Sequence, residues 1–120
     1  MSKRHDFKQL AIYIRSLKLA ENILTLVDEV KPYRLGEQLA GSAISIPSNI
    51  AEGAERGTNK EFHRFLEYSS GSAAELFTQL TIIDRTGKYK QHPINSWIKE
   101  CDELNAMIRG FMIKIKNDPM

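Results

Sequence analysis

Residues 45–53 read SIPSNIAEG and place a proline inside a segment whose apolar residues otherwise follow helical spacing. A proline within a helix loses one hydrogen bond and crowds the carbonyl four residues earlier, here that of Ala43, at a cost of about 3 kcal/mol. The apolar stripe nevertheless stays in phase across Pro47; its members are Leu35, Leu39, Ala43, Ile46, Ile50 and Ala54. This phase predicts one helix from about Leu35 to about Ala54, kinked at Pro47.

Two other structures fit part of this stretch. A helix that restarts with Pro47 in its first turn would lose little, because the first turn has unpaired amides anyway. A strand over 43–46 would use the alternation in Ala-Ile-Ser-Ile, but it is short and has no partner strand in the sequence, so we reject it. In the kinked helix, the hydroxyls of Ser42 and Ser45 are near enough to satisfy a freed carbonyl.

Residues 6–30 predict a long first helix, since they contain no Gly or Pro. One face, which we take as its core face, carries Leu10, Ile14, Leu17, Leu24 and Val27. Further apolar residues broaden it: Ile12, Tyr13, Leu19, Ala20, Ile23 and Leu26. One core-facing stripe needs fewer, so the surplus indicates a wide core or a contact with another subunit. Lys31-Pro32-Tyr33-Arg34 ends this helix.

Two more helices follow the second. Thr58-Asn59-Lys60-Glu61 fits a capping box that starts the third helix, and Gly87 is its expected terminator. Its predicted core face is Phe62, Phe65, Leu66, Ala73, Leu76, Phe77, Leu80 and Ile83. Pro93 can open the fourth helix, whose seam at heptad-like steps is Ile94, Trp97, Cys101, Leu104, Ile108, Phe111 and Ile115.

Short connections between these four segments predict an all-α fold, an antiparallel up-down-up-down four-helix bundle with a Pro-kinked second helix, as a single domain over residues 1–120. Small residues gather at 40–43 and at 69–74. They suggest a close crossing of the second and third helices, which would explain Gly71 in a helix interior.

The composition, with 42% hydrophobic and 27% charged residues, is typical of a soluble globular protein. No run is long enough to span a membrane and the amino end lacks a signal-peptide pattern, so we expect a cytoplasmic protein. The lone Cys101 has apolar neighbours at helical spacing, which favours a packed structural thiol. The net charge of +2 does not by itself predict a nucleic-acid partner.

Neither a metal site nor a cofactor is predicted, because no Glu-x-x-His pair of the kind used by di-iron bundles occurs. Asn49 and Glu52 share one face of the second helix, and Glu75 of the third helix is placed to approach them. We interpret this trio as a polar cluster that fixes helix register; a catalytic carboxylate pair is the alternative.

Basic residues gather at the end of the bundle that holds both termini: Lys3, Arg4, Lys8, Arg56, Lys60, Arg64, Lys114 and Lys116. Five acidic residues lie at the same end, so either an ordinary solvated end or a nucleic-acid surface fits the pattern.

The middle of the chain resembles the family of four-helix-bundle proteins named for the intervening sequences of bacterial 23S ribosomal RNA. The matching residues are Gln38-Leu39, residues 45–53, Glu61-Phe62, Phe65-Leu66, Gly71-Ser72 and Glu75-Leu76. We take Pro47, Asn49, Glu52, Gly53, Gly71, Ser72 and Glu75 as its structural motif. The resemblance implies a helical bundle, a second helix that runs through the proline, and a ring-shaped homopentamer.

The resemblance also suggests a function. A related branch, the accessory variability proteins of diversity-generating retroelements, forms pentamers that bind nucleic acid and a reverse transcriptase. Family members commonly carry a basic pair after the Gln-Leu, where this chain has Ala40-Gly41. The remaining candidates for nucleic-acid binding are Lys60, Arg64, Lys114 and Lys116. The leading hypothesis is a non-enzymatic homo-oligomer, a pentamer, associated with RNA or a ribonucleoprotein; a protein-binding scaffold without nucleic acid is the alternative.

Overall fold

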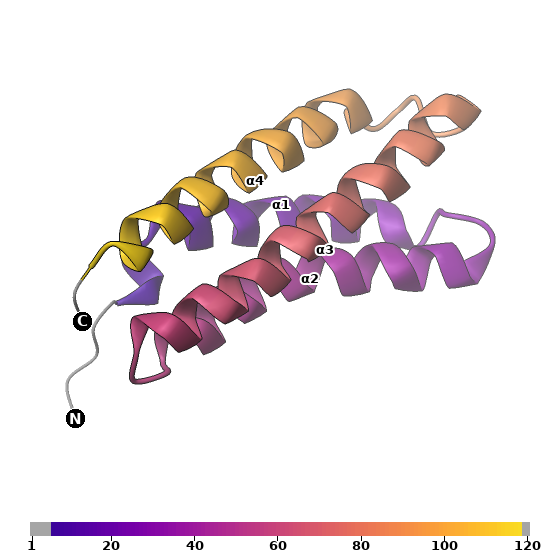
Figure 1. Cartoon of the computed structure of the whole chain (residues 1–120). Coiled ribbons are helices and arrows are strands. Elements are labelled where there is room, and N and C mark those ends of the chain that lie inside the picture. The colour runs from indigo at the N-terminus through magenta and orange to yellow at the C-terminus, as the bar shows by residue number, and fades with distance from the viewer. Residues whose placement is uncertain (1–5, 119–120) are drawn as a thin grey trace.

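The structure is a computed structural model that describes residues 6–118, and these residues form helices and no strand. A single 3-10 turn, η1 (Phe7–Gln9), precedes four α-helices: α1 (Ala11–Val27), α2 (Tyr33–Ala54), α3 (Asn59–Thr86) and α4 (Ile94–Lys116). The helices pack side by side into a rod of 49 × 22 × 20 Å (Figure 1). The packing of α2 on α1, of α3 on α2 and of α4 on α3 is consistent with a bundle, and the up-down order stays a prediction.

The second helix is continuous through the proline. All residues from Tyr33 to Ala54 are helical and Pro47 lies buried inside, so the strand and the restarted helix are both wrong. Nearby carbonyls receive side-chain donors: Asn49 Nδ2 donates to the carbonyl of Ser45 at 2.9 Å, and Ser69 Oγ of α3 donates to the carbonyl of Ile46 at 2.8 Å. The Ser45 hydroxyl donates to the carbonyl of Ser42 at 3.4 Å. The expected acceptor was the carbonyl of Ala43, which Pro47 leaves without its helical donor. The kink at Pro47 stays a prediction.

The predicted start and end of α3 and the predicted start of α4 are confirmed, but only the Thr58 half of the capping box forms in the described residues, because the Glu61 carboxylate pairs with Arg64. Thr58 caps α3, its Oγ1 accepting from the Glu61 amide at 3.2 Å, and Gly87 ends α3 in the left-handed region with φ 69°. Only glycine adopts that region without strain. Pro93 stands at the N-cap of α4, and the predicted seam of α4 is buried except for Phe111, which is partly buried.

The predicted core face of α1 is wrong. The structure buries Ile12, Leu19, Ala20, Ile23 and Leu26, the residues that we expected only to broaden the apolar surface. The expected core residues are partly buried or exposed; Ile14, Leu17 and Leu24 are 52%, 41% and 46% exposed. The orientation is fixed in part by Arg15, whose Nη2 lies 2.6 Å from Glu100 Oε1 and 3.0 Å from Glu103 Oε1 on α4. The helix is also shorter than predicted, since Leu10 is extended and Asp28 already ends it.

Gly71 does not serve the α2–α3 crossing. A Cβ atom built there would meet nothing within 4 Å, and the residue is exposed. The crossing uses the neighbours of Gly71: Ser69 and Ser72 are buried, and the Ser72 hydroxyl hydrogen-bonds with the Ser45 hydroxyl. A position of the α2–α3 approach that does require glycine is Gly53, where a Cβ would lie 2.7 Å from the Cβ of Phe65.

Cys101 packs in the core, as its apolar neighbours predict. It is buried, and this burial raises the pKa of its thiol to about 12, so the thiol stays protonated.

A polar cluster around Glu29 ties the segment after α1 to the segment before α4. The Glu29 carboxylate lies 2.9 Å from His92 Nε2 and accepts a hydrogen bond from the Gln91 amide at 2.8 Å. These two hydrogen bonds lower the pKa of Glu29 below its usual value of 4.5, and the bond with His92 has the larger effect.

This lowered pKa predicts a pH dependence of stability. A carboxylate with a depressed folded-state pKa stabilises the fold above its unfolded-state pKa, and the contribution is lost as the pH falls through the folded-state pKa. We expect Glu29→Gln to have a lower Tm than the wild type at neutral pH, and the difference to disappear well below pH 4.5. Thermal unfolding followed by circular dichroism measures this, with Glu37→Gln, an exposed carboxylate on α2, as the control. A difference that widens as the pH falls would contradict the assignment.

Candidate nucleic-acid interface

The candidate surface lies at the end of the bundle where α2 joins α3, which we call the α2–α3 end. Figure 1 shows the last turn of α4 at the same end. A hydrogen bond of 3.2 Å from Asn59 Nδ2 to the carbonyl of Ile115 joins the first turn of α3 to the last turn of α4. Lys60, Arg64, Lys114 and Lys116 all lie within two turns of this contact.

The four predicted cations do not form one patch. Lys60 and Lys116 are exposed and line one surface pocket of about 340 Å³, together with Asn59 and His63. Lys114 lines another shallow pocket of about 400 Å³, between the start of α1 and the end of α4. Arg64 lies on the side of α3 that faces α2. Only Lys60 and Lys116 are therefore brought together; Lys3 and Arg4 of the same predicted end lie outside the described residues.

Asn59 adds an unsatisfied acceptor to the Lys60 and Lys116 pocket. Its side chain is buried, and its Nδ2 atom donates a hydrogen bond to the carbonyl of Ile115. Its Oδ1 atom has no hydrogen-bond partner among residues 6–118. The pocket thus combines two ammonium groups with the Asp118 carboxylate and a buried amide, a mixture suited to polar ligands.

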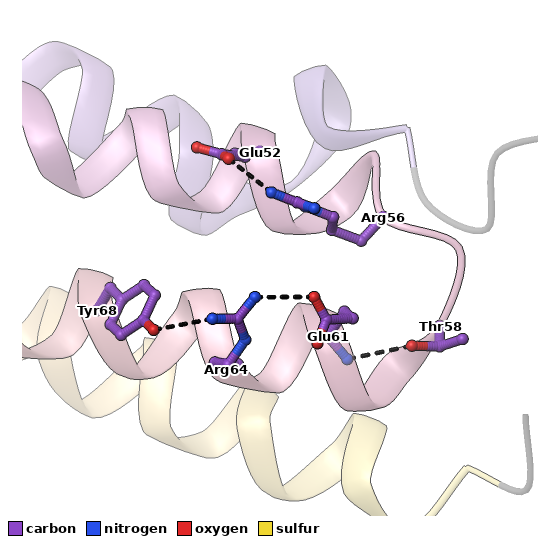
Figure 2. Close-up of polar contacts among 6 residues, drawn as sticks. All are labelled: Glu52, Arg56, Thr58, Glu61, Arg64 and Tyr68. Carbon is purple, nitrogen blue, oxygen red and sulfur yellow. Dashed lines mark hydrogen bonds and ion pairs between the residues drawn. The ribbon is translucent and has the colours of Figure 1, made fainter.

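Arg64 belongs to a cluster that also includes Arg56 of the loop between α2 and α3. Figure 2 shows two ion pairs: Arg56 Nη2, in the loop, lies 2.9 Å from Glu52 Oε2 on α2, and Arg64 Nη2 lies 2.9 Å from Glu61 Oε1, both on α3. Arg64 Nη1 donates in addition to the Tyr68 hydroxyl at 3.0 Å. The hydrogen bond from Arg64 lowers the pKa of Glu61, so this carboxylate is ionised at neutral pH.

The two arginines share one aromatic ring. The guanidinium carbon of Arg56 lies 4.7 Å from the ring centre of Phe65, and that of Arg64 lies 5.0 Å from it. Phe65 is buried and also meets the ring of Tyr68 edge to face at 5.4 Å. We call Arg56, Arg64, Phe65 and Tyr68 the arginine–aromatic cluster. Such stacking holds guanidinium groups in place at the surface without neutralising them.

Sequence reasoning missed Arg56 and Tyr68 as members of this surface. Arg56 counted only toward the charge of the bundle end, and Tyr68 was not singled out. One signal was present: Lys60, Arg64 and Tyr68 are spaced by four residues and so share one face of α3. The part played by Arg56 was not readable, because it depends on how closely α2 approaches Phe65.

The expected trio of Asn49, Glu52 and Glu75 does not assemble. Asn49 bonds within its own helix, Glu52 is exposed and pairs with Arg56, and Glu75 is exposed on α3. No hydrogen bond or ion pair joins Glu75 to the other two within the described residues. The arrangement holds neither the register-fixing cluster nor the carboxylate pair that the sequence suggested.

A family model described as 23S rRNA-intervening sequence protein matches residues 8–110. The chain belongs to this family. One solved structure with the same fold is a protein of unknown function from Bacteroides thetaiotaomicron, assigned to the S23 ribosomal protein family. It has a TM-score of 0.76 and 24% sequence identity, and the match covers 85% of this chain and 98% of that one.

These comparisons confirm the family that the sequence resemblance predicted. No curated protein matches the sequence. Neither description names an enzymatic activity. A relation to the accessory variability proteins stays a prediction. In residues 6–118 no helix is both long and apolar enough to cross a membrane.

Proposed function

We propose that this chain is a non-enzymatic, cytoplasmic RNA- or ribonucleoprotein-associated protein that acts as a homo-oligomer, a pentamer as the family resemblance implies. Its subunit would be an antiparallel up-down-up-down bundle with a kink at Pro47. The observation that carries the RNA part is the gathering of exposed cations at the α2–α3 end, two of them in one pocket and two stacked on one ring.

Self-association is supported by an exposed apolar groove between α1 and α2. It has a volume of about 380 Å³ and is lined by Tyr13, Leu17, Leu24, Ile44 and Pro47. Leu17, Leu24 and Ile44 are each more than 40% exposed in the single chain. A contiguous apolar surface of this kind commonly marks a protein contact, and the two-sided apolar pattern of α1 is then explained by a core on one side and a second subunit on the other.

Assembly matters for RNA binding because the charge of one subunit is small. A net charge of +2 per chain gives a weak field, but a ring repeats each cationic pocket around its axis. Phosphates along one RNA strand would then meet several pockets at once, and linked contacts raise the overall affinity well above that of one pocket.

The test is binding of the purified full chain to a mixed RNA pool at about 50 and about 200 mM salt, conditions that separate phosphate binding from other contacts. We expect binding that weakens steeply with salt. Lys60→Ala combined with Lys116→Ala should weaken it further and flatten the salt dependence, since each lost phosphate contact lowers the slope by about one. Lys99→Ala, which removes an exposed lysine from the other half of α4, is the matched control. Absence of RNA binding at low salt would contradict the proposal.

A protein-binding scaffold is the second candidate. It is favoured by the carboxylates that already pair with both arginines of the arginine–aromatic cluster. An oligomer that retains no RNA at low salt would support this candidate over the first.

A further inference from the structure

Gly71 has no structural explanation in the packing of the chain. It lies in the interior of α3, where glycine is less favourable than alanine, and a side chain there would meet no other group. It is exposed on the helix surface. Gly41 and Gly110 are open and exposed inside helices in the same way, so what distinguishes Gly71 is the aromatic residue three positions before it, Tyr68.

Because residue 71 is glycine, it has no side chain that could extend over Tyr68. Residues three and four apart share a helix face, so Lys60, Arg64, Tyr68 and Gly71 follow one another along the same face of α3. Helical side chains lean toward the amino end and cover the residue three or four positions earlier. A side chain at 71 would therefore lie over position 68.

Tyr68 is at the same time held in place by Arg64 and Phe65. Its hydroxyl accepts a hydrogen bond from Arg64 at 3.0 Å, and its ring meets Phe65 edge to face with an interplanar angle of 83°. The residue is nevertheless 47% exposed. A fixed, half-exposed aromatic ring is the feature on which nucleobases stack in proteins that bind single strands.

The cations beside Tyr68 are suited to the phosphates on either side of a stacked base. Arg64 lies 5.7 Å from the Tyr68 ring centre, Arg56 stacks on the neighbouring Phe65, and Lys60 is about two turns from Tyr68 on the same face. The carboxylates of Glu52 and Glu61 that pair with the arginines are themselves exposed or nearly so. Exposed ion pairs contribute little, whereas a guanidinium binds phosphate through two parallel hydrogen bonds, so a phosphate can displace these carboxylates.

We infer that the arginine–aromatic cluster binds single-stranded nucleic acid, with a base stacked on Tyr68 beside Gly71 and the flanking phosphates on Arg56 and Arg64. This inference rests on the proposed function, since it specifies which form of RNA is bound and where. Stacking is tolerant of sequence because every base has a π face, so the cluster selects single strands over duplexes and not one sequence over another.

The experiment compares three probes by fluorescence anisotropy with the full chain: a labelled 12-nucleotide RNA single strand, its duplex, and an abasic strand with the same number of phosphates. The single strand should bind at least about fivefold more tightly than the abasic strand, the size expected for one stacked base. Tyr68→Ser should remove that difference, and Tyr68→Phe should retain it because the ring remains.

Gly71→Gln separates binding from folding. Glutamine favours helix over glycine, so the variant should unfold at a higher temperature while its single-strand affinity falls about fivefold, because the new side chain covers Tyr68. Gly41→Gln on α2, where a Cβ also meets nothing within 4 Å, should gain the same stability and keep the affinity.

The outcomes distinguish the two proposals. If RNA binds but the abasic strand binds equally well, or Gly71→Gln binds like Gly41→Gln, the stacking site is wrong and the phosphate-binding function stands. If none of the three probes binds at low salt, the proposed function fails and the stacking site with it. Retention of a protein partner in the absence of RNA binding would assign the cluster to the scaffold alternative.

Discussion

Phe62→Ala is expected to lower the free energy of unfolding by about 3–5 kcal/mol, the range for removing a large aromatic side chain from a core. Phe62 is only 1% exposed, and its ring meets that of Phe111 on α4 edge to face at 5.6 Å. It also lines the close approach of α2, since its Cδ1 lies 2.9 Å from the position of a Cβ on Gly53. The substitution would thus leave a cavity among three helices.

Phe77→Ala is the matched control for this loss. Phe77 lies on the same helix and was predicted from the sequence to share the core face, but it is 37% exposed. Its truncation should cost about 1–2 kcal/mol, clearly less than that of Phe62, since more than a third of the side chain already meets water. Urea unfolding at one fixed protein concentration measures both, because assembly makes stability depend on concentration. Equal losses in the two variants would mean that the burial assigned to α3 is wrong.

The second large effect is expected at Gly53. A methyl group there would meet the Cβ of Phe65 at 2.7 Å and the carbonyl of Phe62 at 3.3 Å, and neither group is the flexible end of a side chain. Gly53→Ala should therefore destabilise the fold by about 1–3 kcal/mol through overpacking, in spite of the better helix propensity of alanine.

Gly41→Ala reverses the sign of that effect. Gly41 lies on the same helix, but a methyl group there meets nothing within 4 Å. The substitution should stabilise the fold by up to about 1 kcal/mol, which is the difference in helix propensity. Two substitutions of the same kind on one helix, with opposite signs, test the α2–α3 approach in a way that a single variant cannot. A stabilising Gly53→Ala would show that the two helices lie farther apart.

The sequence was most informative where one apolar stripe stands alone on a helix. The seam of α4 and the stripe of α2 each run at three- and four-residue steps with mostly polar residues on the other faces, and both are buried nearly as predicted. The ends of α3 were also predictable, because a capping threonine and a left-handed glycine act locally, through bonds within one turn.

The orientation of α1 was not predictable, because apolar residues lie on both of its sides. Ile23 and Leu24 are adjacent and equally apolar, yet the first is fully buried and the second is 46% exposed. The choice between the two faces depends on a partner helix: Arg15 must reach Glu100, 85 residues later in the chain. No local pattern contains that information.

The candidate site was predictable in its location and not in its composition. Lys60 and Lys116 were both expected at one end of the bundle, and a single pocket holds them. The arginine–aromatic cluster was missed because Arg56 reaches Phe65 only where Gly53 lets α3 come close to α2. Gly71 was attributed to packing because small residues surround it in sequence, although its own position faces outward.

The central claim, a homo-oligomer assembled through the α1–α2 groove, is tested most directly by solution mass. Multi-angle light scattering at micromolar concentration should give a mass of about five chains of 13.7 kDa for the wild type. Leu17→Glu should shift the mass toward one chain without unfolding the bundle, because Leu17 lines the groove and is 41% exposed, so the new charge meets water unless a second subunit covers it. A wild-type mass of a single chain would contradict the account.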